Sequence, residues 1–305
     1  MNLRFFGHWL AFLWAVTKRS ELSEAVRKAK SAGATGFELI YHVLNKLGPQ
    51  KTAEALRTGG MSKAIMCIFF PPGQDGAAPP MGDPLGEGKS FDAAVETFRR
   101  VLRFMTALRG YGIDIGEVAG PSCWVLGKKY EHLTWPQKKE RILKFFAALG
   151  GDLGPFKVAI ELLRSGEDFV VETVEHWIEL IDALNEAHGT KCFYAHYDTF
   201  HINERGIDQA TAIQQLGRRI LHLHLNGTGR RPAGGEGDTL DWAAIMAALQ
   251  ENVMDGRSAT NEPFCDLVRG HSPELGDGLP PAVQEPGGMI TTRETLEQNG
   301  VRIIA

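Results

Sequence analysis

The chain has 305 residues, of which 43% are apolar and 23% are charged, and its formal net charge is −4. These values predict a globular protein with a sizeable core, and the lack of a long basic run argues against nucleic acid as its main partner. The four cysteines form no C-x-x-C pair, so we expect reduced thiols in a cytoplasmic protein, without a disulfide framework.

The apolar stretch at residues 5–16 is the one segment that resembles a signal peptide. It contains His8, has no small-x-small cleavage site and runs into a charged helical segment. It is also too short to span a membrane. We therefore expect a first strand followed by an aromatic loop, and no membrane association.

Strand-like and helix-like segments then alternate along the whole chain. The predicted strands are 3–6, 36–41, 63–70, 113–119, 157–163, 191–197, 220–225 and 258–264. The predicted helices are 21–32, 42–56, 91–109, 134–149, 169–188, 207–216, 240–251 and 291–298. Many glycines and prolines between residues 71 and 89 predict a long loop there.

Eight strands alternating with about as many helices predict an α/β protein with a (β/α)8 TIM barrel fold. The length is near the ~250 residues typical of this fold, whose active sites lie at the C-terminal ends of the strands. We expect a single domain over residues 1–305, with an irregular C-terminal extension at 265–290. An open doubly wound sheet is the alternative, but no G-x-G-x-x-G follows the first strand.

Residues of metal-ligand type stand at the ends of the last four predicted strands: Glu161, Asp198, His224 and Glu262. Adjacent strands lie about 5 Å apart, so four consecutive strand ends can surround one cation. Three carboxylates and one imidazole suit Mn²⁺, Mg²⁺ or Co²⁺ better than a thiolate-type zinc site. The alternative for any one of these residues is an ordinary ion pair.

Glu161 and Glu262 come from non-adjacent strands, so they are expected to approach a bound substrate from opposite sides. Two carboxylates on opposite faces of one carbon, beside a Lewis acid, can remove a proton from one face and return one to the other. This is the chemistry of an epimerase that acts next to a carbonyl group.

The segment 219–237 combines a strand, in which His222 and His224 share one face, with a glycine-rich loop that carries two arginines. This combination suits a metal site that holds an anionic or polyhydroxylated ligand. We expect His222 to be structural. Glu38, at the end of the second strand, fits a site contact and a structural pair equally well.

Several motifs resemble the D-tagatose/D-psicose 3-epimerase family, which belongs to the xylose-isomerase-like sugar isomerase and epimerase barrels. They are D-T-F-H-I-N at 198–203, E-P-F at 262–264, H-L-H at 222–224 followed by Arg230, G-E-G at 235–237 followed by Trp242, and Glu161 followed by Glu167. The resemblance is densest between residues 157 and 264.

The resemblance implies one divalent metal ion, Mn²⁺ first and Co²⁺ or Mg²⁺ as alternatives, held by Glu161, Asp198, His224 and Glu262. It implies that Glu161 and Glu262 are the acid/base pair, and that His201 and Arg230 hold oxygens of a small sugar substrate. Glu167 would support the site. We also expect a homo-oligomer, either a dimer or a tetramer.

Two segments depart from the family pattern: Arg164 replaces an asparagine, and residues 226–229 lack a glutamate and an asparagine. The first hypothesis is therefore a ketose 3-epimerase that works through a metal-bound enediolate. The second is an aldose–ketose or keto-inositol isomerase with the same site. A metal-dependent hydrolase of the endonuclease IV type is weakened by the few histidines at strand ends. A silent sugar-binding barrel is disfavoured by the intact acid/base pair.

Overall fold

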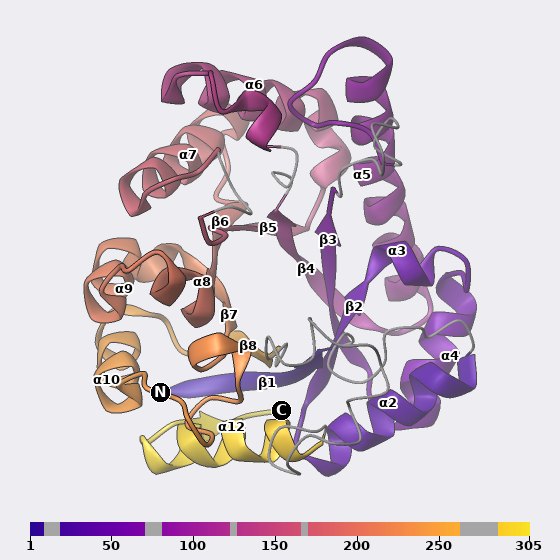
Figure 1. Ribbon diagram of the computed structural model, residues 1–305. Helices are drawn as coiled ribbons and strands as arrows, with labels where there is room; N and C mark the ends of the chain where they lie inside the picture. Colours follow the sequence, from indigo (N-terminus) through magenta and orange to yellow (C-terminus); the bar gives the residue numbers. More distant parts are fainter. Residues whose placement is uncertain (9–18, 71–80, 123–126, 166–169, 263–285) are drawn as a thin grey trace.

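Eight parallel strands form a closed barrel, which confirms the predicted (β/α)8 TIM barrel. The computed structural model describes residues 1–8, 19–70, 81–122, 127–165, 170–262 and 286–305. Figure 1 shows the strands as an inner ring with helices around it. The barrel strands are β1 (Asn2–His8), β2 (Gly36–Ile40), β3 (Lys63–Phe69), β4 (Asp114–Ser122), β5 (Lys157–Glu161), β6 (Phe193–Asp198), β7 (Ile220–His224) and β8 (Arg257–Asn261).

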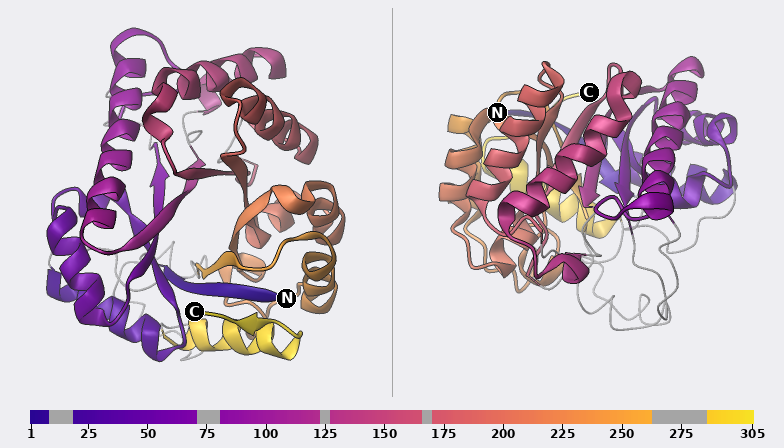
Figure 2. Two further views of the ribbon diagram at one scale, coloured as in Figure 1. Left: turned by 180° about the vertical axis from the view of Figure 1, so that it is seen from behind. Right: turned by 90° about the horizontal axis from the view of Figure 1, so that it is seen from above.

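The barrel closes because β1 pairs in parallel with both β2 and β8. A short ninth strand, β9 (Arg302–Ile303), pairs in parallel with Asn2 and Leu3 at the start of β1. Backbone hydrogen bonds from Arg302 to Met1 and from Ile304 to Leu3 hold the two ends of the chain together. The right-hand view of Figure 2 accordingly shows both termini at the same end of the barrel.

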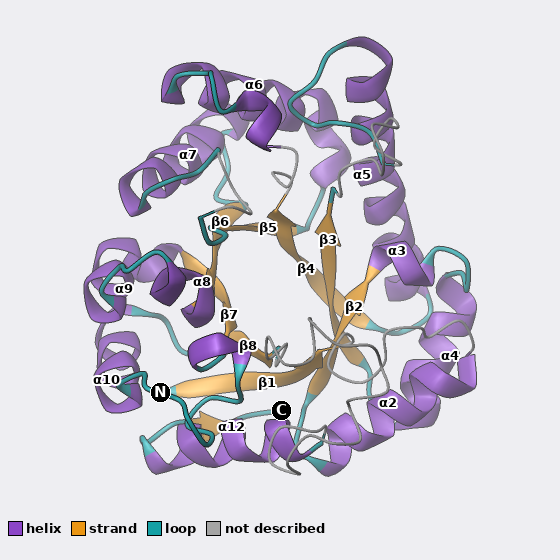
Figure 3. Cartoon of the chain, in the orientation of Figure 1, coloured by secondary structure: helices purple, strands orange, loops and turns teal. Residues whose placement is uncertain are grey.

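An outer layer of helices covers the barrel (Figure 3). These helices are α2 (Arg19–Ser31), α3 (Tyr41–Leu44), α4 (Pro49–Gly59), α5 (Gly88–Gly110), α6 (Trp135–Leu149), α7 (Val174–His188), α8 (Thr199–Glu204), α9 (Gln209–Leu216), α10 (Trp242–Asn252) and α12 (Gly287–Gln298). Four 3₁₀ turns accompany them: η2 (Gly127–Tyr130), η3 (Gly150–Leu153), η4 (Gly217–Arg219) and η5 (Thr228–Arg230). No helix among these is long and apolar enough to cross a membrane.

Local sequence explains where several helices begin. Thr134 and Gln137 form a capping box at the start of α6. The side chain of Asp241 accepts a hydrogen bond from the amide of Ala244 at the start of α10. These bonds satisfy amide groups that the first helical turn leaves without partners.

Most apolar burial lies between the strands and the helices. Phe98 of α5, for example, packs edge-to-face against Phe145 and Phe146 of α6. Inside the barrel, Phe6 and Ile65 form a separate small cluster with Ala119. Bulky branched residues usually fill this space. The polar residues that share the barrel interior here are therefore unusual for the fold.

Several predicted boundaries were wrong. The predicted helix 42–56 is two helices: α3 ends at Leu44, and α4 starts at Pro49 after Gly48, whose φ of 82° is not helical. The helix predicted to begin at 169 begins at Val174, where Thr173 caps it. The short elements α8 and β9 were not predicted. The extension at 265–290 falls mostly outside the described residues, and 287–290 belong to α12. That residues 1–305 form one domain stays a prediction.

Candidate metal and catalytic site

The four predicted ligand residues meet at the C-terminal end of the barrel. Glu161, Asp198 and His224 are the last residues of β5, β6 and β7, and Glu262 directly follows β8. All four side chains are buried. Asp198 and His224 are register partners on adjacent strands. Ligand atoms of Asp198, His224 and Glu262 lie within 4.8 Å of one another, so the structure places them as the strand ends predict.

His201 joins this group from the first turn of α8. Asp198 caps that helix, since its Oδ1 accepts a hydrogen bond of 2.7 Å from the amide of Phe200. The cap brings His201 Nε2 to 3.7 Å from both Asp198 Oδ2 and Glu161 Oε1. Residue 201, which the resemblance assigns to substrate binding, is therefore also within reach of the metal-ligand atoms.

Arg230 points into the same group of carboxylates. Its Nη1 donates a hydrogen bond of 2.6 Å to Glu262 Oε2 and lies 3.5 Å from Asp198 Oδ2. Its Nη2 lies 2.8 Å from His201 Nε2, and the guanidinium stands 4.4 Å above the ring of Phe200. Arg230 has φ 58°, in the left-handed region that a residue with a side chain rarely adopts. Strained backbone of this kind is typical of functional loops.

Glu38 lies directly beneath these ligands. It comes from β2, is fully buried, and accepts a hydrogen bond of 2.6 Å from Thr260 Oγ1. Its Oε2 lies 3.0 Å from His222 Nε2 and 3.2 Å from His224 Nε2. Glu38 is therefore both a structural pair and a contact of a predicted ligand, the two interpretations that the sequence left open.

His8, at the end of β1, was not predicted as a site residue. Its Nε2 lies 3.6 Å from Glu262 Oε1 and 3.8 Å from Glu38 Oε1. The same strand-end position that identified the other ligands would have identified His8. The predicted first strand ended two residues too early, at Phe6, and this concealed the signal.

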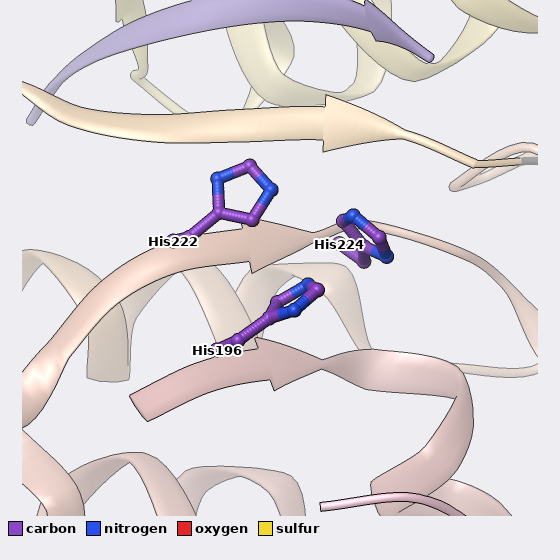
Figure 4. Close-up of side chains that lie close together, drawn as sticks. All are labelled: His196, His222 and His224. Atoms are coloured by element: carbon purple, nitrogen blue, oxygen red, sulfur yellow. The ribbon is translucent and has the colours of Figure 1, made fainter. Parts of the chain in front are cut away.

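Three histidines pack against one another below the site: His196 from β6, and His222 and His224 from β7 (Figure 4). The ring centroids of His196 and His224 are 4.0 Å apart, nearly perpendicular, and those of His196 and His222 are 4.7 Å apart. His222 already uses both nitrogens, with Ser258 Oγ at 2.8 Å and Glu38 at 3.0 Å. These contacts confirm the structural role expected for His222 and favour ring packing over a three-histidine metal site.

The two predicted acid/base residues have pKa shifts in opposite directions. Burial raises the pKa of Glu161 well above its ordinary range, and the charges of Asp198 and Glu262 add to the shift. Burial also opposes ionisation of Glu262, but His224 and Arg230 hold its pKa well below the ordinary range. Paired groups whose environments separate their pKa values in this way are typical of acid/base sites.

The donor set fits a divalent metal ion. Asp198 and Glu262 share the site with Glu161, and burying three such charges without a cation is costly. Carboxylate oxygens with one imidazole suit Mn²⁺, Co²⁺ or Mg²⁺. His224 is directed toward these oxygens, with Nδ1 at 3.0 Å from Glu262 Oε2 and 3.8 Å from Asp198 Oδ2.

Some residues singled out in the sequence lie outside the described residues. Glu167, which the resemblance assigns to support of the site, is one of them. Arg164 is described, and its amide donates a hydrogen bond of 2.9 Å to His201 Nδ1. Its guanidinium lies 5.5 Å from the centre of the Phe200 ring. The departure from the family pattern at 164 therefore lies next to the site.

A family model described as a xylose isomerase-like TIM barrel matches residues 26–284. The chain belongs to this family. The motifs that suggested the family, from residue 157 to residue 264, lie inside the matched range.

Several proteins that are similar to this chain are named as epimerases. A D-psicose 3-epimerase of Enterocloster bolteae is 36% identical over 107 residues, which cover 35% of this chain and 33% of that protein. The D-allulose 3-epimerase of Methylomonas sp., solved with D-allulose, has a TM-score of 0.74 at 16% identity and covers 98% of this chain and 97% of its own. A D-psicose 3-epimerase of Clostridium cellulolyticum H10, solved with D-tagatose, has a TM-score of 0.71 at 14% identity, covering 97% and 98%. The curated relative thus aligns over about a third of its length, and the two structures establish the shared fold.

Proposed function

We propose that this protein is a metal-dependent sugar epimerase, and most specifically a ketose 3-epimerase. The observation that carries the proposal is the pair Glu161 and Glu262. They stand at one barrel mouth with two strands, β6 and β7, between them, and their pKa values are shifted in opposite directions. The named relatives, which include D-psicose and D-allulose 3-epimerases, support the same reaction class.

Glu161, Asp198, His224 and Glu262 would hold one divalent ion, and Mn²⁺ is our first choice, ahead of Co²⁺ or Mg²⁺. When bound, the ion would act as a Lewis acid on the carbonyl and adjacent hydroxyl oxygens of the sugar. The buried position of all four side chains excludes water that would otherwise compete for these oxygens.

The two glutamates would carry out the proton transfers. One carboxylate removes the proton from the carbon next to the carbonyl, and the electron pair of the C–H bond enters an enediolate. The other, protonated, returns a proton to the opposite face of the same carbon, which inverts it. Glu161 and Glu262 would take these two roles. The reverse reaction exchanges the two roles.

His201 and Arg230 would bind the sugar. Arg230 donates to Glu262 and approaches His201, so a substrate that enters beside Glu262 meets both side chains. Fixed guanidinium and imidazole groups are suited to hold hydroxyl and carbonyl oxygens. Glu167 would support this shell, and Arg164 would adjust which sugar fits.

The same site could instead move a carbonyl between neighbouring carbons, in an aldose–ketose or keto-inositol isomerase. The residues at 164 and 226–229 favour considering this isomerase as the second candidate, because they replace residues that the family pattern assigns to sugar binding. In that segment, the side chain of Asn226 is bound to the protein itself. Its Oδ1 accepts a hydrogen bond of 3.0 Å from the amide of Glu262, and its Nδ2 lies 3.4 Å from Asp198 Oδ1.

One experiment separates these functions. The protein is stripped with EDTA, reloaded with Mn²⁺, and incubated with ketohexoses, aldoses and keto-inositols in D₂O, and products are identified by NMR. We expect inverted ketose with deuterium at carbon 3, only in the reloaded sample. Deuterium at an aldose carbon 2 would indicate the isomerase instead, and full activity in EDTA would overturn the metal-dependent mechanism.

We further propose that residues 1–305 act as one cytoplasmic domain that assembles into a dimer or tetramer. The alignment of the epimerase structures over 97% or more of this chain supports the single domain. Light scattering on the purified protein measures the assembly directly, and a monomer at micromolar concentration would contradict it.

A further inference from the structure

The loop between β7 and α10 carries Arg230 to the site, and its backbone adopts a costly conformation there. Gly229 and Arg230 have φ of 62° and 58°. This left-handed region is open to glycine but unfavourable for an arginine. Such a conformation persists only where surrounding contacts hold it in place. The contacts that hold this loop therefore determine where the guanidinium of Arg230 lies.

The inner side of the loop is bonded to the barrel mouth. Asn226 Oδ1 accepts a hydrogen bond of 3.0 Å from the amide of Glu262, and the amide of Asn226 donates at 2.8 Å to Thr199 Oγ1. The amide of Gly227 donates at 2.7 Å to the carbonyl of Arg231. These bonds close the turn η5 at its base.

The outer side of the loop is organised around the carboxylate of Asp238. Its Oδ1 accepts hydrogen bonds of 2.9 Å from the amide of Thr228 and 3.1 Å from the amide of Leu240. Its Oδ2 accepts 2.8 Å from the amide of Gly234 and 2.6 Å from Nε1 of Trp242. One side chain therefore connects the start of η5 to the middle of the loop and to the first residue of α10.

Gly227 lies directly against this carboxylate. A Cβ atom at residue 227 would be 2.4 Å from Cγ and Oδ2 of Asp238. The backbone of Gly227 is extended, with φ −75° and ψ −179°, so Asp238 requires the glycine and the backbone does not. The segment 226–229 lacks the glutamate of the family pattern, and a carboxylate from residue 238 lies against the segment instead.

We propose that Asp238 is a positioning residue for Arg230. Its hydrogen bonds hold the turn in which Arg230 has its left-handed backbone, and the guanidinium then donates to Glu262 and lies above the ring of Phe200. The inference rests on the proposed function, which assigns sugar binding to Arg230.

Two variants test this role, each with a matched control. Asp238→Asn keeps the size of the side chain, but its NH₂ group must face N–H donors on one side, so bonds to the loop are lost. Gly227→Ala adds a methyl group that displaces Asp238. The controls are Asp241→Asn, because asparagine caps α10 as well as aspartate does, and Gly110→Ala at the end of α5, where a Cβ atom meets nothing within 4 Å.

The first readout is the position of the Arg230 side chain in the metal-free protein. Its guanidinium stands 4.4 Å from the centre of the Phe200 ring, so the ring current shifts its Nε–H signal in ¹H–¹⁵N spectra. The absence of one signal in Arg230→Lys identifies it. We expect this signal to move toward the position of exposed arginines in Asp238→Asn and Gly227→Ala, and to stay in place in both controls.

The second readout is kcat/KM of the Mn²⁺-loaded protein with D-allulose. Displacing a substrate-positioning group by about 1 Å can cost about 100-fold in rate. We expect kcat/KM to fall roughly 10–100-fold in both variants and to keep its wild-type value in both controls. In an Arg230→Ala background, Asp238→Asn should change kcat/KM by less than about twofold, because two residues that act as one unit are not additive.

The outcomes separate this inference from the proposed function. Wild-type protein that turns over no ketose would contradict the proposed function, and the Arg230 signal would still test the inference. Active wild-type protein, with an unmoved Arg230 signal and kcat/KM within twofold of the controls in both variants, would overturn the inference alone.

An Asp238→Asn effect that is equally large with and without Arg230 would also overturn the inference, since Asp238 would then act by another route. If Arg230→Ala is too slow to measure, the Arg230 signal decides. If Asp238→Asn does not fold, Gly227→Ala decides, and an unmoved signal in that variant counts against the inference.

Discussion

At the scale of single residues, the site is a set of strand-end side chains whose charges are balanced within the group. Arg230 donates to Glu262, and Glu38 accepts from Thr260 and faces two histidines. Burial raises the pKa of Glu161, whereas at Glu262 the neighbouring His224 and Arg230 outweigh burial and lower the pKa. At this scale, function depends on which of the two glutamates has a positively charged side chain beside it.

Arg164→Asn tests which residues select the sugar. Arg164 contacts His201 through its amide, and its guanidinium lies near Phe200. We therefore expect the ranking of kcat/KM among ketoses to change while the metal requirement remains. Identical relative kcat/KM values for all tested sugars in variant and wild type would contradict this role.

The sequence predicted the residues whose position depends only on strand order. Asp198 and His224 stand at strand ends one βα unit apart, so alternation alone placed them. His8 was missed because the predicted first strand ended at Phe6. His196 was missed, and Glu38 was left undecided, because their role depends on which inward-facing side chains meet inside the barrel. That requires the strand register, for example Glu161 opposite His196, which a single sequence does not contain.

At the scale of elements, the short helix α8 connects capping to metal binding. Asp198 ends β6, caps α8 through Oδ1, and directs Oδ2 toward the other ligands. Short elements such as α8 have too few residues for a periodic pattern, which explains why the sequence did not predict it. The break between α3 and α4 was readable, since Gly48-Pro49 is a turn signal.

Asp198→Asn separates the two roles of this residue. Asparagine caps helices as well as aspartate does, so we expect α8 and the Tm of the metal-free protein to be preserved. The loss of a charged oxygen ligand should weaken Mn²⁺ binding by about tenfold or more. Calorimetric titration measures the affinity, and unaltered Mn²⁺ affinity in the variant would remove Asp198 from the ligand set.

At the scale of the whole molecule, closure of the barrel brings β5 and β8 to one mouth although Glu161 and Glu262 lie 101 positions apart in the sequence. The alternation of strands and helices predicted this architecture, since consecutive parallel strands place all their C-terminal ends at one face. The segments outside the described residues include Glu167, which the resemblance assigns to the support of the site.

Acid sensitivity of the whole fold should depend partly on His42. Burial lowers the pKa of His42 from 6.5 to about 4, although a hydrogen bond with the backbone of Phe69 opposes the shift. A depressed pKa in the folded state means that His42 favours folding above pH 6.5 and that this contribution is lost as pH falls toward 4. His42→Phe should therefore lose less stability, by on the order of 2 kcal/mol, between pH 7 and pH 4. Chemical denaturation at both pH values measures this, and equal losses in the two proteins would contradict it.

The proposed reaction requires that Glu161 and Glu262 act on opposite faces of one carbon. Its most direct test is epimerisation and solvent-proton exchange in D₂O by Glu161→Gln and Glu262→Gln, with metal content verified in each variant. We expect each substitution to slow epimerisation by at least the ~10²–10⁴-fold typical of losing an acid or base, while exchange without inversion survives in one of them. A metal-loaded Glu262→Gln protein that epimerises at the wild-type rate would contradict the two-carboxylate mechanism.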